Sequence, residues 1–181
     1  MTFRKILAAL GLTLALSPLA NAVPILGGNI FVTETGNVTA TYLGHTAGYT
    51  NELYLYLPSN GLGIIFNNHT TPVGTTFDLG SFTAGTELVF AIHVLNTDET
   101  FYSGDASRNA DGIAHAVVDT EYSADAAYVG FEDLFGGGDR DYDDVKFSFT
   151  NIGTTEVPEP APLALFALGL LGLGLARRKH S

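Results

Sequence analysis

The stretch that decides the fold reads AYVGFEDLFGGGDRDYDDVKFSF and covers residues 127–149. Its two ends alternate between apolar and other side chains with a period of two, which is typical of β-strands. The apolar residues of 127–131 therefore share one face, and those of 145–149 share another. A glycine-rich, acidic segment connects them, so the stretch predicts an antiparallel hairpin whose two apolar rows face one core.

Similar short runs recur outward from this hairpin, separated by turn residues such as Pro58-Ser59-Asn60-Gly61. They lie at residues 38–43, 53–57, 63–66, 88–95 and 114–118. The run 88–95 is apolar on both faces, which indicates a central strand. No segment between the two ends of the chain shows a helical period over a useful length. The pattern predicts an all-β fold, a single jelly-roll-like β-sandwich.

The first 22 residues have the composition of a secretory signal peptide. Arg4 and Lys5 form a basic start, residues 6–16 form an apolar run, and Ala20 and Ala22 give the small-x-small cleavage pattern. We expect signal peptidase to cut after Ala22, so that residues 1–22 are removed and the rest is exported through the inner membrane.

The other end of the chain carries an apolar segment followed by a basic tail. Residues 163–176 contain no polar side chain, and Arg177, Arg178 and Lys179 follow within the tail 177–181. A helix of this length covers about 21 Å at ~1.5 Å per residue, which is short of a bilayer core of ~30 Å. We expect a short transmembrane helix that inserts transiently in the inner membrane, with its basic tail on the cytoplasmic side.

Just before this helix stand Val157, Pro158, Glu159 and Pro160. This motif, an apolar helix and a basic end in that order resemble the PEP-CTERM sorting signal of Gram-negative bacteria, here over 157–181. The resemblance implies recognition and cleavage by an exosortase, and an association with exopolysaccharide and biofilm formation. It implies membrane anchoring before cleavage, and a cell-surface or extracellular location after it.

The predicted domain between these signals, residues 23–156, is strongly acidic. Its basic residues are Arg108, Arg140 and Lys146, against seventeen acidic residues between positions 23 and 154, a net charge of −14. This balance argues against nucleic acid as a partner, because phosphates require a basic surface. The chain has no cysteine, so no disulfide stabilises the exported domain.

Six acidic residues crowd the connection of the hairpin, and three adjacent glycines lie among them. They are Glu132, Asp133, Asp139, Asp141, Asp143 and Asp144. Two like charges ~7 Å apart cost roughly 2 kcal/mol at an effective dielectric constant of 20. A bound calcium ion replaces this repulsion by attraction, since it takes several oxygen ligands in flexible geometry. The stretch predicts a calcium site, with an acidic loop in open solvent as the alternative.

Residues 139, 141 and 143 match the first three ligand positions of an EF-hand loop, but the sixth and twelfth positions do not match, and no helices flank them. The site is therefore predicted to be of another kind. A second acidic cluster, with Asp105, Asp111 and Asp119, lies upstream. It offers further ligands or a second site, although an ordinary polar loop between strands explains it more simply.

The segment FEDLFGGGDRDYDD followed by VKFSF, with SGDASRNADGIAHAVV upstream, resembles domain of unknown function 4114 over about residues 90–149. The resemblance implies an exported bacterial domain, similar in composition to the calcium-loaded β domains of adhesins, and it implies no settled activity. Asp143 stands where that family usually has asparagine, which keeps an oxygen ligand and adds a charge.

We expect no enzymatic activity, because no nucleophile with a base stands out, and paired carboxylates on a glycine loop are poorly fixed. The sequence instead predicts a structural or adhesive protein of the exopolysaccharide matrix. The alternative is a carbohydrate-binding module for extracellular polysaccharide, with Tyr54 and Tyr56 as its aromatic residues. Calcium-dependent retention on polysaccharide would favour the binding module.

Overall fold

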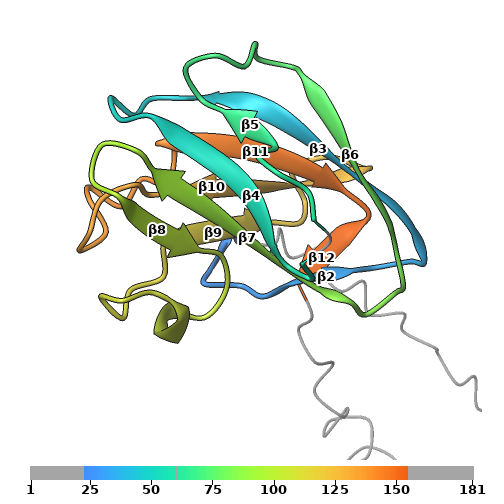
Figure 1. Cartoon of the computed structure of the whole chain (residues 1–181). Coiled ribbons are helices and arrows are strands. Elements are labelled where there is room, and N and C mark those ends of the chain that lie inside the picture. The colour runs from blue at the N-terminus through green and yellow to red at the C-terminus, as the bar shows by residue number, and fades with distance from the viewer. Residues whose placement is uncertain (1–22, 60, 155–181) are drawn as a thin grey trace, which may run out of the picture.

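Two antiparallel β-sheets face each other in the structure, a computed structural model that describes residues 23–59 and 61–154 (Figure 1). The all-β prediction is confirmed, and the described residues contain one short 3-10 helix, η1, Ala106–Arg108. Within the described ranges, no helix is long and apolar enough to cross a membrane. The predicted signal peptide 1–22, sorting motif 157–160, membrane helix 163–176 and basic tail 177–181 lie outside the described residues.

Four strands, β3, β4, β6 and β7, have seven to ten residues, and the others have two to six. They are β1 (Ile25–Leu26), β2 (Ile30–Val32), β3 (Gly36–His45), β4 (Asn51–Leu57), β5 (Phe66–Asn67), β6 (Thr76–Phe82), β7 (Glu87–Val94), β8 (Glu99–Tyr102), β9 (Ala116–Asp119), β10 (Ala126–Phe131), β11 (Val145–Thr150) and β12 (Ile152–Thr154).

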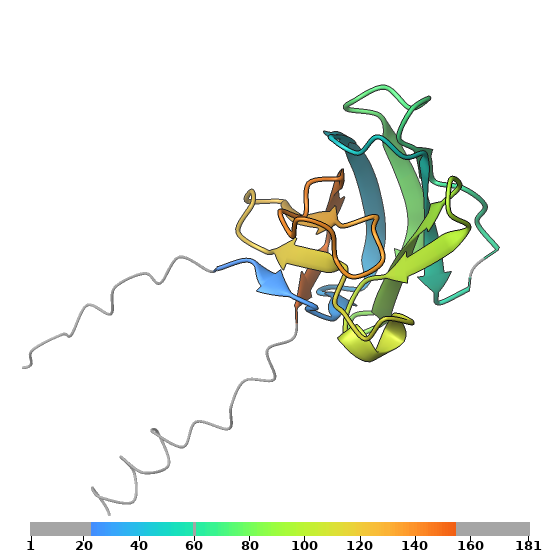
Figure 2. The same ribbon diagram turned by 90° about the vertical axis from the view of Figure 1, so that its left-hand side faces the viewer.

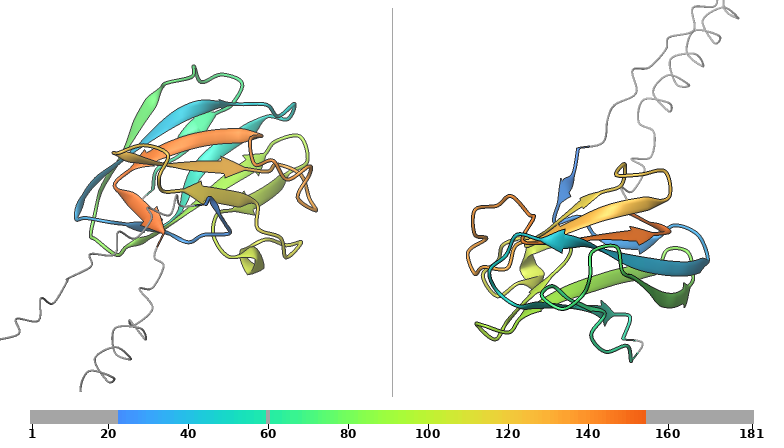
Figure 3. Two further views of the ribbon diagram at one scale, coloured as in Figure 1. Left: turned by 180° about the vertical axis from the view of Figure 1, so that it is seen from behind. Right: turned by 90° about the horizontal axis from the view of Figure 1, so that it is seen from above.

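The first sheet has the order β1-β9-β10-β11-β3-β6, and the second has the order β12-β2-β7-β4-β5, with β8 also paired to β7. Figures 2 and 3 show the two sheets stacked as layers, with the segments that connect them at the rims. Adjacent strands in sequence often lie in different sheets, as β3 and β4 do, so the chain crosses the core repeatedly. This arrangement is a β-sandwich.

The predicted hairpin forms, and its two apolar rows face the core as expected. Ala127 pairs with Phe149, Val129 with Phe147, and Phe131 with Val145. All six side chains belong to the buried core between the sheets. Since neighbouring pairs on one face lie side by side, the two apolar rows close one half of the core.

The second sheet supplies the other half of the core by the same alternation. Leu88, Phe90, Ile92 and Val94 of β7 point inward, together with Leu53 and Leu55 of β4. The predicted central strand is confirmed, because β7 pairs with β4 on one side and with β2 and β8 on the other.

The structure differs from the predicted pattern at some short strands. The run 63–66 forms a strand only at its end, where Phe66 begins the two-residue β5. The sequence also did not reveal β1, β2, β6, β8 and β12. These strands are short or lie at sheet edges, so few of their side chains enter the core and their alternation is weak.

Candidate functional site

The acidic loop, defined as residues 132–144, joins β10 to β11 at one end of the first sheet. Its backbone is unusual, because Arg140 and Tyr142 adopt left-handed φ values of 64° and 56°. Gly138 has φ 46°, and a Cβ at this position would collide with Oε2 of Glu132. Left-handed conformations cost non-glycine residues roughly 1–2 kcal/mol each. The loop therefore holds a backbone arrangement that packing around it must stabilise.

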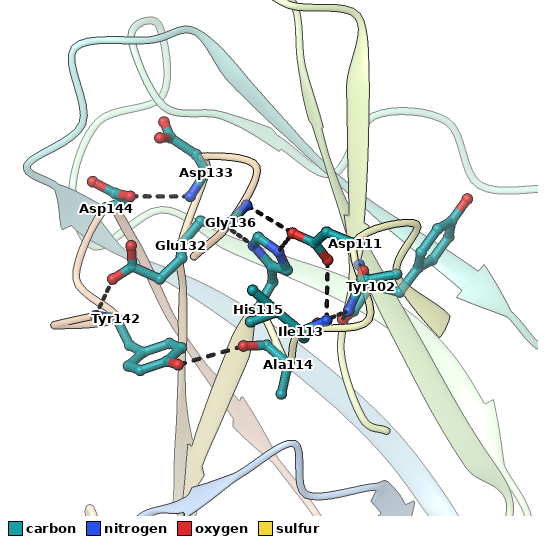
Figure 4. A network of polar contacts seen from close by, with 11 residues as sticks. Tyr102, Asp111, Ile113, Ala114, His115, Glu132, Asp133, Gly136, Tyr142 and Asp144 are labelled. Carbon is teal, nitrogen blue, oxygen red and sulfur yellow. Dashed lines mark hydrogen bonds and ion pairs between the residues drawn. The ribbon is translucent and has the colours of Figure 1, made fainter. Parts of the chain in front are cut away.

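Glu132 is the first residue after β10, and its side chain is fully buried. Oε1 accepts a hydrogen bond of 2.7 Å from the backbone N–H of Tyr142, as Figure 4 shows. Oε2 is buried and has no hydrogen-bond partner. Burial raises the pKa of Glu132, and the charges of Asp139 and Asp141 add to this, although backbone N–H groups of the loop oppose it.

Asp139 and Asp141 bring their carboxylates to the same place. Glu132, Asp139 and Asp141 each offer an oxygen, and these atoms all lie within 4.8 Å of one another. The two aspartates are exposed, whereas Glu132 forms the buried floor. Three carboxylate oxygens converging from a glycine-rich loop suit a hard divalent cation such as calcium, and the additional ligands of such an ion are commonly backbone oxygens and water.

Asp133 and Asp144 form a separate pair near Glu132. Oδ2 of Asp144 accepts a hydrogen bond of 3.0 Å from the backbone N–H of Asp133. Oδ2 of Asp133, whose side chain is buried, accepts one of 2.7 Å from Nδ2 of Asn51 in β4. This contact joins the first sheet to the second. Asp133 and Asp144 also line a shallow cavity of about 340 Å³ beside the segment 46–49.

Asp143 points to a third place. Its carboxylate accepts a hydrogen bond from the hydroxyl of Thr46 and lies 3.4 Å from Nζ of Lys146. The hydrogen bond from Thr46, with the nearby charge of Lys146, holds the pKa of Asp143 below its usual value. The six acidic residues predicted as one site are thus divided into three groups, of which one has the form of a cation site.

The second predicted cluster does not gather at one point. Asp105 caps η1 by accepting from the backbone N–H of Ser107, and Asp119 accepts from the backbone N–H of Glu121 in a turn. Asp111 alone reaches the acidic loop, because its Oδ2 accepts a 2.8 Å hydrogen bond from the backbone N–H of Gly136. Among the described residues these three aspartates do not converge as potential metal ligands.

Asp111 acts together with His115, which is fully buried and stacked on Phe101 at 3.9 Å. Nε2 of His115 lies 2.8 Å from Oδ2 of Asp111, and Nδ1 lies 3.1 Å from the backbone oxygen of Glu132. Burial would raise the pKa of Asp111, but hydrogen bonds from Gly136, His115 and Ile113 outweigh this effect and hold it below its usual value. The pair fixes the backbone of Glu132 and one glycine of the loop (Figure 4).

Sequence patterns did not reveal Asn51, Thr46 or the positioning role of His115. Asn51 and Thr46 lie more than eighty residues before the acidic groups they contact. A local pattern carries no signal for such contacts. The one signal in the sequence is an asparagine at the start of an apolar strand, because a buried amide needs hydrogen-bond partners.

Two regions of the chain match known families. Residues 74–151 match a domain of unknown function (DUF4114), and residues 156–179 match the PEP-CTERM protein-sorting motif. Searches of curated proteins and of solved structures gave no match. The first match contains the whole acidic loop, and the second marks an exported protein that an exosortase processes at its C-terminal segment. The chain is therefore similar to DUF4114 over residues 74–151, and the match to the sorting motif follows directly at residues 156–179.

Proposed function

We propose that the exported domain is a calcium-stiffened structural or adhesive module of the cell surface or the exopolysaccharide matrix, with no catalytic role. The observation that carries this proposal is the carboxylate of Glu132, which is buried with one oxygen unpartnered. It lies beside Asp139 and Asp141 within 4.8 Å. Biofilm localisation is part of the proposal, supported by the sorting motif.

A buried ionised carboxylate with a free oxygen is strongly unfavourable unless a proton or a cation compensates it. Two further carboxylates nearby make the local charge more negative. The electrostatic attraction of a divalent cation is therefore stronger there than at an isolated side chain. Calcium fits better than zinc or copper, since the ligands are carboxylates and no cysteine exists in the chain.

Calcium at this position would close the loop on itself, because its ligands come from both ends of a ten-residue segment. The loop is already tied to the segment after β3 through Thr46 and to β4 through Asn51. An ion that orders the loop therefore also restrains the adjoining loops of both sheets. Binding to the folded state alone stabilises it by mass action.

The test is a calcium titration of the purified protein by calorimetry, with thermal unfolding at each calcium concentration. Calcium at 100 times its dissociation constant stabilises a folded state by roughly 2.7 kcal/mol. For a domain of this size we expect a rise in Tm on the order of 10 °C. The double variant Asp139→Asn, Asp141→Asn should lose most of this rise, and both changes are at exposed positions that leave the core intact.

Glu132→Gln should affect stability without calcium and stabilisation by calcium in opposite directions, and screening of charges by salt does not produce this combination. Without calcium this variant should be at least as stable as the wild type, because it removes a buried charge, yet it should gain little from calcium. The matched control is Asp125→Asn, an exposed acid outside the acidic loop, which should respond as the wild type does. An equal calcium response in the double variant, or the same response to sodium chloride at equal ionic strength, would contradict the proposal.

A further inference from the structure

A groove runs along the outer face of β7, on the side of the second sheet that points away from the core. The inward residues of β7 belong to the core cluster between the sheets, whereas Val89 and Ala91 lie on the opposite face, where neighbouring side chains leave them 1% and 3% exposed. Successive outward residues lie ~7 Å apart, so positions 87 to 93 span about 20 Å. Val89 lies at the floor of one hollow and Ala91 at the floor of another along this length.

Tyrosines stand on both sides of this floor. Ala91 pairs with Tyr54 of β4 on one side and with Tyr102 of β8 on the other, so the three residues form one row across three strands. Asn109 holds Tyr102 in place, because it accepts from the backbone N–H of Tyr102 at 2.7 Å and donates to its oxygen at 3.2 Å. The walls of the groove are therefore aromatic and at least partly fixed before any ligand arrives.

Tyr56 enters the groove through an irregularity of β4. Leu55 pairs with Phe90 and Leu57 with Val89, so Tyr56 is the extra residue of a β-bulge. Bulges redirect side chains, and here the ring of Tyr56 meets the ring of Tyr102 edge-on with centroids 4.8 Å apart. Tyr56 lines two adjacent hollows, of about 330 Å³ and 530 Å³.

Polar groups border each hollow. Arg108 lines the smaller hollow and donates to Glu87 at 2.6 Å. His93 and Thr100 line the larger hollow, with Nδ1 of His93 and Oγ1 of Thr100 3.0 Å apart. Near the larger hollow the hydroxyl of Tyr54 donates to Glu52 at 2.6 Å. This contact fixes the hydroxyl of Tyr54 at the edge of the hollow and leaves its oxygen as an acceptor.

We propose that this groove binds a neutral polysaccharide, with sugar rings seated in the two hollows on either side of Tyr56. A sugar ring presents apolar C–H faces and a rim of hydroxyls. Tyrosine rings over a small-residue floor suit the faces, and planar donors and acceptors at the edges suit the hydroxyls. The net charge of −14 across residues 23–154 selects against acidic chains.

This proposal stands apart from the calcium site. The groove lies on the second sheet, between β4 and β8, whereas the acidic loop joins two strands of the first. A ligand at Tyr56 contacts none of the residues that would hold calcium. Either proposal can therefore fail without the other, and binding in the presence of a chelator separates them.

The experiment is isothermal titration of the purified protein, in chelator, with cellohexaose, maltohexaose and mannohexaose. At least one of these should bind, and Tyr56→Ala should weaken it by roughly tenfold or more, which is typical of a central aromatic contact. Tyr122→Ala is the matched control, because Tyr122 is 50% exposed and Tyr56 is 52% exposed, but Tyr122 lies outside the groove. It should bind as the wild type does.

Three results would overturn the proposal. The first is the absence of binding for all three sugars, and the second is binding that Tyr56→Ala leaves unchanged. The third is self-association in sedimentation velocity that Tyr56→Ala removes, since this would assign the groove to a second copy of the chain. A hexamer of galacturonic acid tests the charge argument, and binding tighter than that of the neutral sugars would contradict it.

Discussion

At the scale of single residues, Asp144 shows how burial and neighbouring charges act on one carboxyl group. Burial raises its pKa to about 6, against the opposing hydrogen bond from the backbone N–H of Asp133 and with the added repulsion of Asp133 and Glu132. An aspartate in an unfolded chain titrates near 4. The folded state therefore holds more protons than the unfolded state between about pH 4 and pH 6.

It follows that, with calcium removed by a chelator, Asp144 contributes a negative slope to the free energy of unfolding between about pH 4 and pH 6, whereas the lowered pKa values of Asp111, Asp143 and His45 contribute slopes of the opposite sign. Asp144→Asn should reduce this slope, because its neutral side chain does not titrate and its amide oxygen still accepts from Asp133. The raised pKa of Glu132 leaves some slope in the variant. Urea unfolding across this pH range measures the effect, and an unchanged slope in the variant would contradict the assignment.

At the scale of elements, the hairpin β10–β11 was predictable because each strand carries its own pattern. Alternating apolar residues fix which face is buried, and a shift of one residue would expose all of them. The acidic loop was recognisable for the same reason, since its charges and glycines are local. Its division into three groups was not predictable, because that depends on Thr46, Asn51 and His115, which other strands bring to the loop.

The tie between two loops gives an element-scale prediction. Thr46→Val removes the hydroxyl that bonds Asp143, while the backbone N–H groups of residues 46 and 47 still donate to the oxygen of Asp144. We expect faster amide hydrogen exchange in residues 44–49 and 139–144 and calcium binding a few-fold weaker. These effects follow because ordering the loop then costs more conformational entropy.

The control for this change is Thr76→Val, at an exposed threonine of β6 on the edge of the first sheet. It alters the same chemical group away from the acidic loop, so exchange in 44–49 and 139–144 should match the wild type. Exchange that stays unchanged in Thr46→Val would show that the hydroxyl contact does not hold the two loops together.

At the scale of the whole molecule, the acidic loop lies where the two sheets meet, and away from the end of the described chain. The loop enters β11 at Val145, and the chain leaves β11 at Thr150 to form β12 beside β2 (Figure 1). Five steps along an antiparallel strand cover about 17 Å. The described chain therefore ends in β12, which follows the end of β11 that lies away from the acidic loop.

Because the hydrogen bond between Asn51 and Asp133 joins the sheets next to the loop, calcium should stabilise the sandwich as one unit. Urea unfolding followed by circular dichroism and by tyrosine fluorescence should give a single coincident transition with and without calcium. Calcium should raise the midpoint and leave the slope m unchanged, since the same surface is exposed on unfolding. The variant Asn51→Ala tests this link directly, because it removes the side chain that joins the two sheets. If the wild type instead unfolds in two steps, with calcium moving only one of them, the loop stabilises its own sheet alone and the two sheets are energetically separate.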